Sequence, residues 1–224
     1  MIFLGLPCTD SFVVKALGGL LHASQKQNVQ LHTKYSSNLT DNFNQLWCQM
    51  LNGEPRAEYF AMLHSDLEVP LWWIDTLIGE LEDNQLDVVS AVVPIKNDLR
   101  VTSTAMLDPE NKEQMVYRLT YDDVKVLPRT FDADDVTVKL GKGVSLLLNT
   151  GCWVAKVGDW CKEFPGFVTN SVVRYMEKTK RYEALSFTED WNASVWFHQK
   201  GLKIGATTAI VPTHYGVNGW NINN

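Results

Sequence analysis

The sequence predicts an α/β fold in a single domain with a mostly parallel, doubly wound sheet. Short apolar runs alternate with segments of helical apolar spacing through the first half of the chain, in the order β-α-β-α-β-α-β. This alternation is typical of parallel sheets joined by right-handed crossovers. The 224 residues are enough for one substantial core, and they contain no internal repeat and no linker between domains.

Local patterns place the elements of the first half. Buried strands are expected at 2–6, 29–35, 59–64 and 88–93, and helices at 11–23, 41–51 and 71–82. Pro7 and Pro94 are expected to end the first and fourth strands, because proline has no backbone N–H for a neighbouring strand. Thr40 or Asp41 is the expected cap of the second helix.

The second half is less regular. Residues 96–143 are polar and lack a clear period, which predicts a lid or acceptor region with a small antiparallel part. Short strands there are expected at 115–119 and 136–140. Beyond it, a strand is expected at 144–148, helices at 168–182 and 189–200, and a bent strand or strand pair at 202–211. A capping box over 186–189 is expected to open the last helix, and Gly201 to end it.

Composition excludes several classes of function. The net charge of −6 provides no basic footprint for nucleic acid or an anionic membrane surface, although a local basic groove is compatible with it. The scattered cysteines contain no Cys-x-x-Cys pair, which favours reduced thiols and a cytoplasmic location. No run approaches the ~18 apolar residues of a transmembrane helix.

Two carboxylates follow the third strand. Asp66 and Glu68 stand between the apolar run 59–63 and the proline-initiated helix at 71–82. Open α/β sheets bind ligands at the carboxyl ends of their strands, and two such carboxylates can hold a divalent cation. The alternative is that Ser65, Asp66 and Glu68 cap the following helix and complement its dipole.

Three later segments also carry candidate groups. Glu189 and Asp190 begin a helix, where they suit either proton transfer or simple capping. His214 follows a late strand, as a metal ligand or a structural group. The turn 149–152 contains Gly151 and precedes Trp153, whose indole is a candidate for packing on a sugar or base.

In their order and spacing, these motifs resemble the GT-A class of nucleotide-sugar glycosyltransferases, especially small family-two-like members from bacteriophages and bacteria. The resemblance covers nearly the whole chain in outline. It rests on Asp66-x-Glu68 as the DXD motif, on 187–191 as the acidic helix start, and on 212–216 as the late histidine segment. Glu68 departs from the pattern, since it replaces an aspartate. The resemblance implies that Asp66, Glu68 and His214 bind Mn²⁺ or Mg²⁺.

The same resemblance implies a transferase that moves a sugar from a UDP- or GDP-sugar to an acceptor hydroxyl, with inversion. Residues 1–95 would form the nucleotide-binding half and 144–224 the acceptor and catalytic half. Asp190, or its neighbour Glu189, would be the base. Donor contacts are expected from Pro7, Thr9, Asp10 and Ser65, and acceptor contacts from Gly151 and Trp153. The acceptor would be a glycan, a lipid-linked sugar, a protein or a modified nucleobase, and a viral member would act in the host cytoplasm.

Two other functions compete with this interpretation. A nucleotidyltransferase would use the same carboxylates to hold Mg²⁺, but the loop after the first strand lacks the usual basic residue. A non-catalytic nucleotide-sugar-binding domain would keep the fold without turnover. Lys96 and Arg100 follow a strand end, where they either approach phosphates or remain in solvent. His64 is expected to support the carboxylate turn or to belong to the core.

Overall fold

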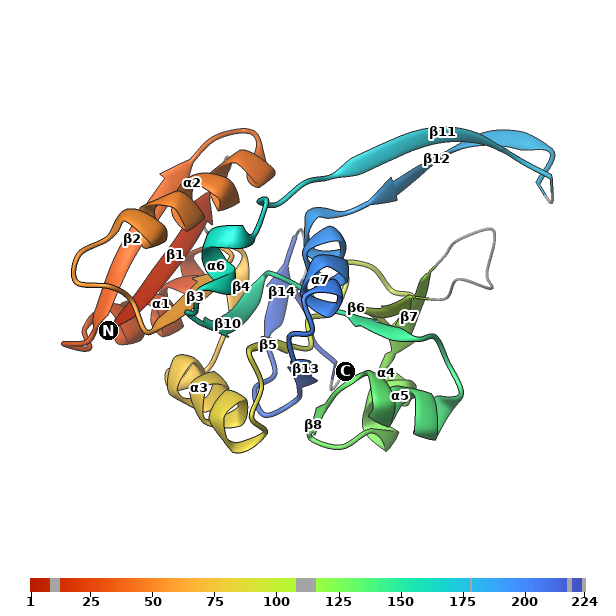
Figure 1. Ribbon diagram of the computed structural model, residues 1–224. Coiled ribbons are helices and arrows are strands. Elements are labelled where there is room, and N and C mark those ends of the chain that lie inside the picture. The colour runs from red at the N-terminus through yellow and green to blue at the C-terminus, as the bar shows by residue number, and fades with distance from the viewer. Residues whose placement is uncertain (9–12, 108–115, 178, 217–218, 223–224) are drawn as a thin grey trace.

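The computed structural model describes residues 1–224 except 9–12, 108–115, 178, 217–218 and 223–224. Its described part is an α/β fold around a seven-stranded sheet of order β2-β1-β3-β10-β5-β13-β8 (Figure 1). The strands are β2 (Val29–Tyr35), β1 (Ile2–Cys8), β3 (Tyr59–Leu63), β10 (Cys152–Lys156), β5 (Val88–Ala91), β13 (Ile204–Thr207) and β8 (Thr130–Phe131). Only β10 and β8 run against the common direction. The predicted α/β class is confirmed, with a mostly parallel sheet.

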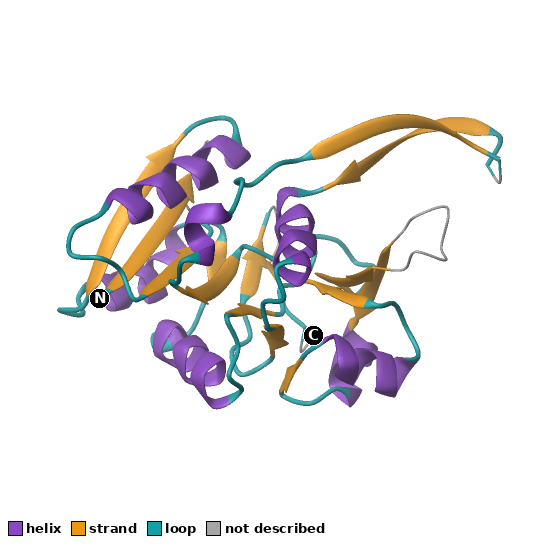
Figure 2. Cartoon of the chain, in the orientation of Figure 1, coloured by secondary structure: helices purple, strands orange, loops and turns teal. Residues whose placement is uncertain are grey.

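Helices cover both faces of this sheet (Figure 2). One face carries α1 (Leu17–Ser24), entered through the 3₁₀ turn η1 (Val14–Ala16), and α3 (Trp73–Asp83). The other carries α2 (Leu39–Asn52), α6 (Trp160–Glu163) and α7 (Glu189–Gln199). Alternate residues of one strand belong to the two core clusters, as Phe60 and Ala61 of β3 do, because side chains of a strand alternate between faces.

Two small antiparallel sheets flank the main one. One contains β7 (Val116–Thr120), β6 (Val101–Leu107) and β9 (Ser145–Leu147), and the other β15 (Gly219–Trp220), β14 (Thr213–Tyr215) and β4 (Leu67–Glu68). Helices α4 (Tyr121–Val126) and α5 (Ala133–Leu140) follow β7. The strand expected at 136–140 is wrong, because Asp132 caps a helix there by accepting from the backbone N–H groups of Asp134 and Asp135.

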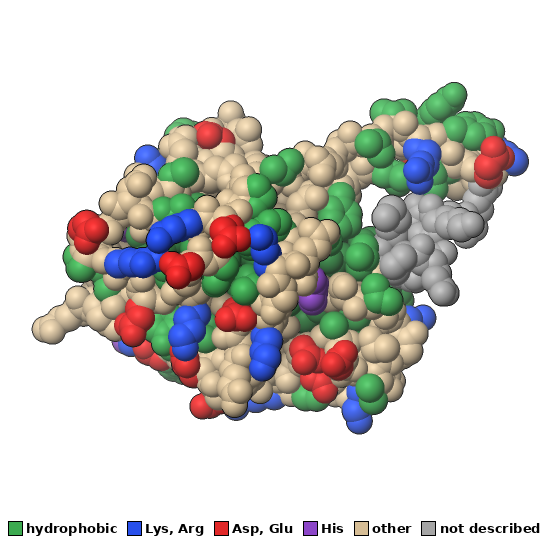
Figure 3. All heavy atoms as spheres, in the orientation of Figure 1, with side chains coloured by type: hydrophobic (Ala, Val, Ile, Leu, Met, Phe, Trp, Pro, Cys, Tyr) green, Lys and Arg blue, Asp and Glu red, His purple; other side chains and the backbone are tan. Residues whose placement is uncertain are grey.

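The helix expected at 168–182 is also wrong. The chain forms a hairpin of β11 (Asn170–Met176) and β12 (Arg181–Phe187), which projects from the body (Figure 1). Val173 lies opposite Ala184, and the rings of Tyr175 and Tyr182 pack edge to face at 5.3 Å. Such cross-strand pairs stabilise a hairpin. The spacing of apolar residues along the chain, from which the helix was expected, does not reveal them. The apolar side chains of the hairpin gather on the surface in Figure 3. Among the hairpin residues, Val173 is 75% exposed.

Helix ends differ in detail from the sequence patterns. Asn38, rather than Thr40 or Asp41, caps α2 by accepting from the Asp41 backbone N–H. The capping box expected over 186–189 is absent, because α7 begins at Glu189 and its N-cap is Thr188 rather than Ser186. The Thr188 hydroxyl makes no cap bond and instead donates to the Asp190 carboxylate. Gly201 does follow α7, with a φ of +73° that suits glycine. Strand β1 continues through Pro7 to Cys8.

Candidate active site

Asp66 and His214 meet at the carboxyl end of β3. Strand β14 pairs with β4 so that His214 lies opposite Leu67, and the Tyr215 backbone N–H donates to the Asp66 carbonyl at 2.9 Å. This pairing brings the His214 Nε2 atom to 3.4 Å from Asp66 Oδ2. Both side chains are partly buried, with 20% of His214 and 28% of Asp66 exposed. Residues far apart in the sequence therefore form one polar cluster at this edge.

The orientation of the His214 ring is fixed by its other nitrogen. His214 Nδ1 lies 2.8 Å from the Pro94 carbonyl oxygen, in the segment that follows β5. A carbonyl only accepts, so Nδ1 carries the hydrogen. Nε2 then faces the Asp66 carboxylate either as a protonated donor or with a lone pair. A backbone carbonyl that holds one ring nitrogen commonly orients a metal-binding histidine in this way.

Lys96 adds a second cation to the same carboxylate oxygen. Its ammonium donates directly to Asp66 Oδ2. Burial would raise the pKa of Asp66, but His214, His64 and Lys96 outweigh burial and hold that pKa below its usual range. Burial also lowers the pKa of the neighbouring His64 to about 4. Asp66 is therefore a carboxylate, and His64 neutral, at physiological pH.

Glu68 does not join this cluster. Its Oε2 atom accepts a hydrogen bond of 2.5 Å from the Tyr215 hydroxyl, which raises the Tyr215 pKa to about 12. The Lys15 ammonium lies over the same tyrosine ring at 5.0 Å. Within the described residues, no three His, Cys, Asp or Glu side chains are grouped so as to hold a metal ion. The structure therefore brings Asp66 and His214 together while Glu68 contacts Tyr215, and binding of a metal ion by all three residues stays a prediction.

That pair still fits a divalent cation. Asp66 Oδ1 and His64 Nε2 are buried and have no hydrogen-bond partner among the described residues. An orphaned carboxylate oxygen is costly unless it meets a cation or a proton donor. One carboxylate and one imidazole suit Mn²⁺ or Mg²⁺ when substrate phosphates supply further oxygens. Asp66 and His214 are therefore the residues that would hold such an ion.

Asp190 is the second reactive group. It lies in the first turn of α7 with only 8% of its surface exposed, and Oδ1 accepts from the Thr188 hydroxyl and the Trp191 backbone N–H. Burial raises its pKa to about 7, and the charge of Glu189 adds to the rise. Thr188, Trp191 and Arg118 act in the opposite sense. A carboxylate with a pKa near neutrality is suited to general base catalysis.

A chain of contacts ties Asp190 to the Asp66 cluster. The Trp191 indole N–H donates to the Ser103 carbonyl at 3.2 Å, and Ser103 in turn donates to the Val93 carbonyl. The next carbonyl along, that of Pro94, holds His214. The Arg118 guanidinium lies over the Trp191 ring at 4.4 Å. The segment after β5 therefore connects Trp191, the neighbour of Asp190 in the chain, with His214, the partner of Asp66.

Glu189 has a different environment. Its carboxylate accepts from the Thr169 hydroxyl at 2.9 Å, at the base of the hairpin. Asn192, one turn along α7, also donates to the carbonyl groups of Val168, Phe187 and Thr188. These bonds fasten the β11–β12 hairpin to the start of the helix. Glu189 therefore supports the hairpin base and raises the pKa of Asp190, whereas Asp190 itself has the buried position.

The expected donor contacts divide into three cases. Thr9 and Asp10 lie outside the described residues. Pro7 is buried inside β1, which leaves little of its ring for a ligand, so that expectation is corrected. Ser65 is buried in the carboxylate turn, and its carbonyl accepts from the Val13 backbone N–H. Asn42 was not identified from the sequence, yet its amide donates to the Cys8 carbonyl at the end of β1.

The expected acceptor contacts are also revised. Trp153 is 1% exposed and packs among Trp47, Phe60 and Phe167 in the core, so it is not an acceptor surface. Gly151 is buried beside the site, and its backbone carbonyl accepts from the backbone N–H of His64 at 2.7 Å. Lys96, His64, Tyr215 and Arg118 have more prominent roles than their sequence context indicated, because no local motif marks them.

Gly151→Ala should test how tightly this turn is packed. A Cβ atom there would lie 2.8 Å from Asn149 Oδ1 and 3.0 Å from Leu67 Cδ1. We expect the free energy of unfolding to fall by about 1–3 kcal/mol, as for other overpacked sites. Chemical denaturation would measure the change. Gly79→Ala is the matched control, because its Cβ would meet nothing within 4 Å; equal effects of the two changes would contradict close packing at Gly151.

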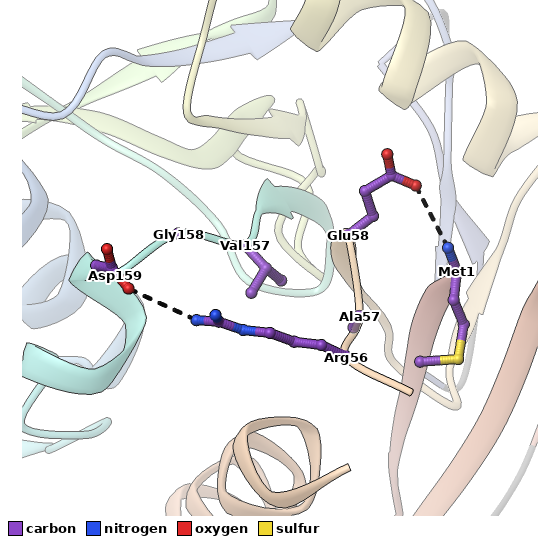
Figure 4. A pocket seen from close by; sticks show the side chains of 7 residues that line it. All are labelled: Met1, Arg56, Ala57, Glu58, Val157, Gly158 and Asp159. Atoms are coloured by element: carbon purple, nitrogen blue, oxygen red, sulfur yellow. Dashed lines mark hydrogen bonds and ion pairs between the residues drawn. The ribbon is translucent and has the colours of Figure 1, made fainter. Parts of the chain in front are cut away.

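A pocket of about 380 Å³ lies at the opposite edge of the sheet. Its lining comes from the residues before β1 and β3 and after the reversed strand β10 (Figure 4). Its charged groups are paired with one another, Met1 with Glu58 at 3.3 Å and Arg56 with Asp159 at 3.7 Å. Because its charges are mutually satisfied and it lacks an orphaned buried group, the carboxyl edge remains the stronger candidate.

Comparison with known proteins identifies a fold and no family. No protein-family model matches the sequence, and no curated protein does. The crystal structure of A197 from STIV is similar, with a TM-score of 0.56 and 12% sequence identity. The match covers 99% of this chain and 90% of that one. At this identity, the similarity shows that the two share a fold and nothing more. The described helices include none that is both long and apolar enough to cross a membrane.

Proposed function

We propose that this protein is a GT-A-like, metal-dependent glycosyltransferase that moves a sugar from a nucleoside-diphosphate sugar to an acceptor hydroxyl. The observation that carries the proposal is the pairing of Asp66 with His214 at the carboxyl edge of a mostly parallel sheet. Such edges bind nucleotides in open α/β folds. The nearby orphaned oxygen of Asp66 supports a cation there. Mn²⁺ or Mg²⁺ would stabilise the negative charge that develops on the departing diphosphate.

The protein's own groups supply the remaining steps. Asp190 would accept the proton of the acceptor hydroxyl, whose oxygen then forms a bond to the anomeric carbon. The bond between that carbon and the diphosphate oxygen breaks, and its electron pair leaves with the nucleoside diphosphate. Attack opposite to the leaving group inverts the anomeric configuration. The buried position of Asp190 and its pKa of about 7 support this role.

Binding of nucleoside diphosphates tests the proposal before any acceptor is identified. We expect UDP or GDP to raise the melting temperature only when Mn²⁺ or Mg²⁺ is present. At a ligand concentration of about 100 Kd, the stabilisation should be about 2.7 kcal/mol, or roughly 5–10 °C. Asp66→Asn and His214→Ala should abolish the metal-dependent shift, because each removes one of the paired donors.

Asp75→Asn is the matched control for Asp66→Asn, since Asp75 also pairs with a lysine, Lys26, but belongs to α3 rather than to the carboxylate turn. It should keep the full shift. The proposal fails if no diphosphate stabilises the folded protein with either metal. It also fails if Asp66→Asn responds to metal and nucleotide as strongly as Asp75→Asn.

A further inference from the structure

Two side chains converge on one oxygen atom of Asp66. The Lys96 ammonium donates to Oδ2, and His214 Nε2 lies 3.4 Å from the same atom. The other oxygen, Oδ1, is buried and has no hydrogen-bond partner among the described residues. The accessible side of this carboxylate is therefore already in contact with a positive charge that belongs to the protein.

A divalent cation bound by Asp66 and His214 would have to replace this contact. A divalent cation on either oxygen of the carboxylate would lie close to the Lys96 ammonium, which contacts Oδ2. Two cations on one carboxylate repel strongly, even with the screening of a partly exposed site. Lys96 and the metal are therefore alternatives at this position, and binding of one weakens binding of the other.

The structure allows Lys96 to move without moving the backbone. The residues just before it are held in place, because Pro94 forms a β-bridge with Thr102 and the Ile95 N–H donates to the Val101 carbonyl at 3.1 Å. The side chain is 34% exposed. A lysine carries a compact charge on a flexible stem of four carbons, so its ammonium can reach a new partner by rotation of that stem.

We propose that Lys96 is an exchangeable counter-ion of Asp66, which competes with the divalent cation for the carboxylate and, once displaced, pairs with the diphosphate of the donor. This inference rests on the proposed function. It assigns Lys96 two opposed effects: the residue weakens metal binding in the absence of nucleotide and strengthens nucleotide binding once metal is present. Metal and nucleotide thereby favour each other, and neither binds tightly alone.

A permanent structural ion pair would behave differently. Ion pairs near the protein surface contribute little to stability, so loss of Lys96 should leave the fold intact under either interpretation. Lys26 provides the comparison, because its ammonium also donates to a carboxylate, that of Asp75, with 27% of the lysine side chain exposed. No histidine shares that contact in the described structure. Replacing each lysine by methionine keeps most of the stem and removes the charge.

Calorimetric titration with Mn²⁺ alone is the first measurement. We expect Lys96→Met to bind Mn²⁺ roughly 10-fold more tightly than the unaltered protein, as removal of one nearby charge predicts. Lys26→Met should match the unaltered protein. Adding Asp66→Asn to Lys96→Met should abolish the gain. Lys96→Gln, which keeps a polar end group, should show the same gain in Mn²⁺ affinity. It replaces the methionine variant if circular dichroism shows that Lys96→Met is unfolded.

Titration with UDP and GDP at saturating Mn²⁺ is the second measurement. We expect Lys96→Met to bind the preferred diphosphate roughly 5–10-fold more weakly, because a charge-assisted contact to phosphate is lost. Unchanged or weaker Mn²⁺ binding by both Lys96 variants would overturn the exchange, as would an unchanged affinity for diphosphate. If neither diphosphate binds any form of the protein, the proposed function fails, whereas the Mn²⁺ titration still reports separately on competition at Asp66.

Discussion

Asp190→Asn is expected to lower turnover by about 10²–10⁴-fold, the usual contribution of a general base. The amide keeps an oxygen that can accept from the Thr188 hydroxyl and the Trp191 N–H, so the local structure should persist. It has no basic electron pair for the acceptor proton. Release of nucleoside diphosphate from a donor sugar, with water as acceptor, would measure the loss without knowledge of the natural acceptor.

The same substitution should stabilise the protein at alkaline pH. The Asp190 pKa is about 7 in the folded chain, against an ordinary value of 3.8. Between these values the folded state binds the additional proton, so stability falls as pH rises and remains lower above pH 7. An asparagine does not ionise. We therefore expect the variant to exceed the unaltered protein by about 1–3 kcal/mol at about pH 8, and to match it near pH 4.

Glu189→Gln distinguishes the two neighbouring carboxylates. The Glu189 charge raises the pKa of Asp190, so its removal should move the acid limb of the activity profile to lower pH while turnover persists. The assignment of Asp190 as the base would be wrong if Glu189→Gln lost the activity and Asp190→Asn kept it. Equal melting temperatures of the unaltered protein and Asp190→Asn across the pH range would contradict the raised pKa.

Trp153→Ala should have the largest effect on stability among single core substitutions. The indole is 1% exposed and lies with its ring centroid 5.3 Å from that of Phe60, 6.2 Å from Phe167 and 6.4 Å from Phe197. Truncation of a buried tryptophan removes its apolar surface from the core and leaves a cavity. We expect a loss of about 3–5 kcal/mol in the free energy of unfolding, measured by chemical denaturation.

Trp153→Phe should cost much less. The Trp153 indole N–H is buried and has no hydrogen-bond partner in the described structure, so phenylalanine removes an unsatisfied donor while it keeps most of the ring. Trp72→Ala provides the surface control, because Trp72 is 60% exposed, and it should change stability by less than about 0.5 kcal/mol. If Trp153→Ala lowered the free energy of unfolding no more than Trp72→Ala does, packing of the aromatic cluster would not be a main source of the core's stability.

The candidate site follows only in part from its motifs. The position of Asp66 after a buried strand identifies it as a candidate, and the late segment 212–216 identifies His214. No local pattern specifies the orientation of the His214 ring. The contact between Asp66 and His214 requires the pairing of β14 with β4 and the carbonyl of Pro94. Glu68 fits the same motif but is held by Tyr215, a partner 147 positions away along the chain. The sequence marks Lys96 only by its position after a strand, and its contact with Asp66 comes from the tertiary structure.

The sequence by itself determined the alternation of strands and helices, the carboxylate turn after β3 and the glycine after α7, because each depends on the period or backbone preference of neighbouring residues. Tertiary structure decided the rest. The β11–β12 hairpin replaced an expected helix because its residues pair across strands. Trp153 entered the core because aromatic side chains from distant segments surround it. Contacts between residues far apart in the chain decide that Asp190 is buried and that Lys96 reaches Asp66. No pattern in neighbouring residues specifies such contacts.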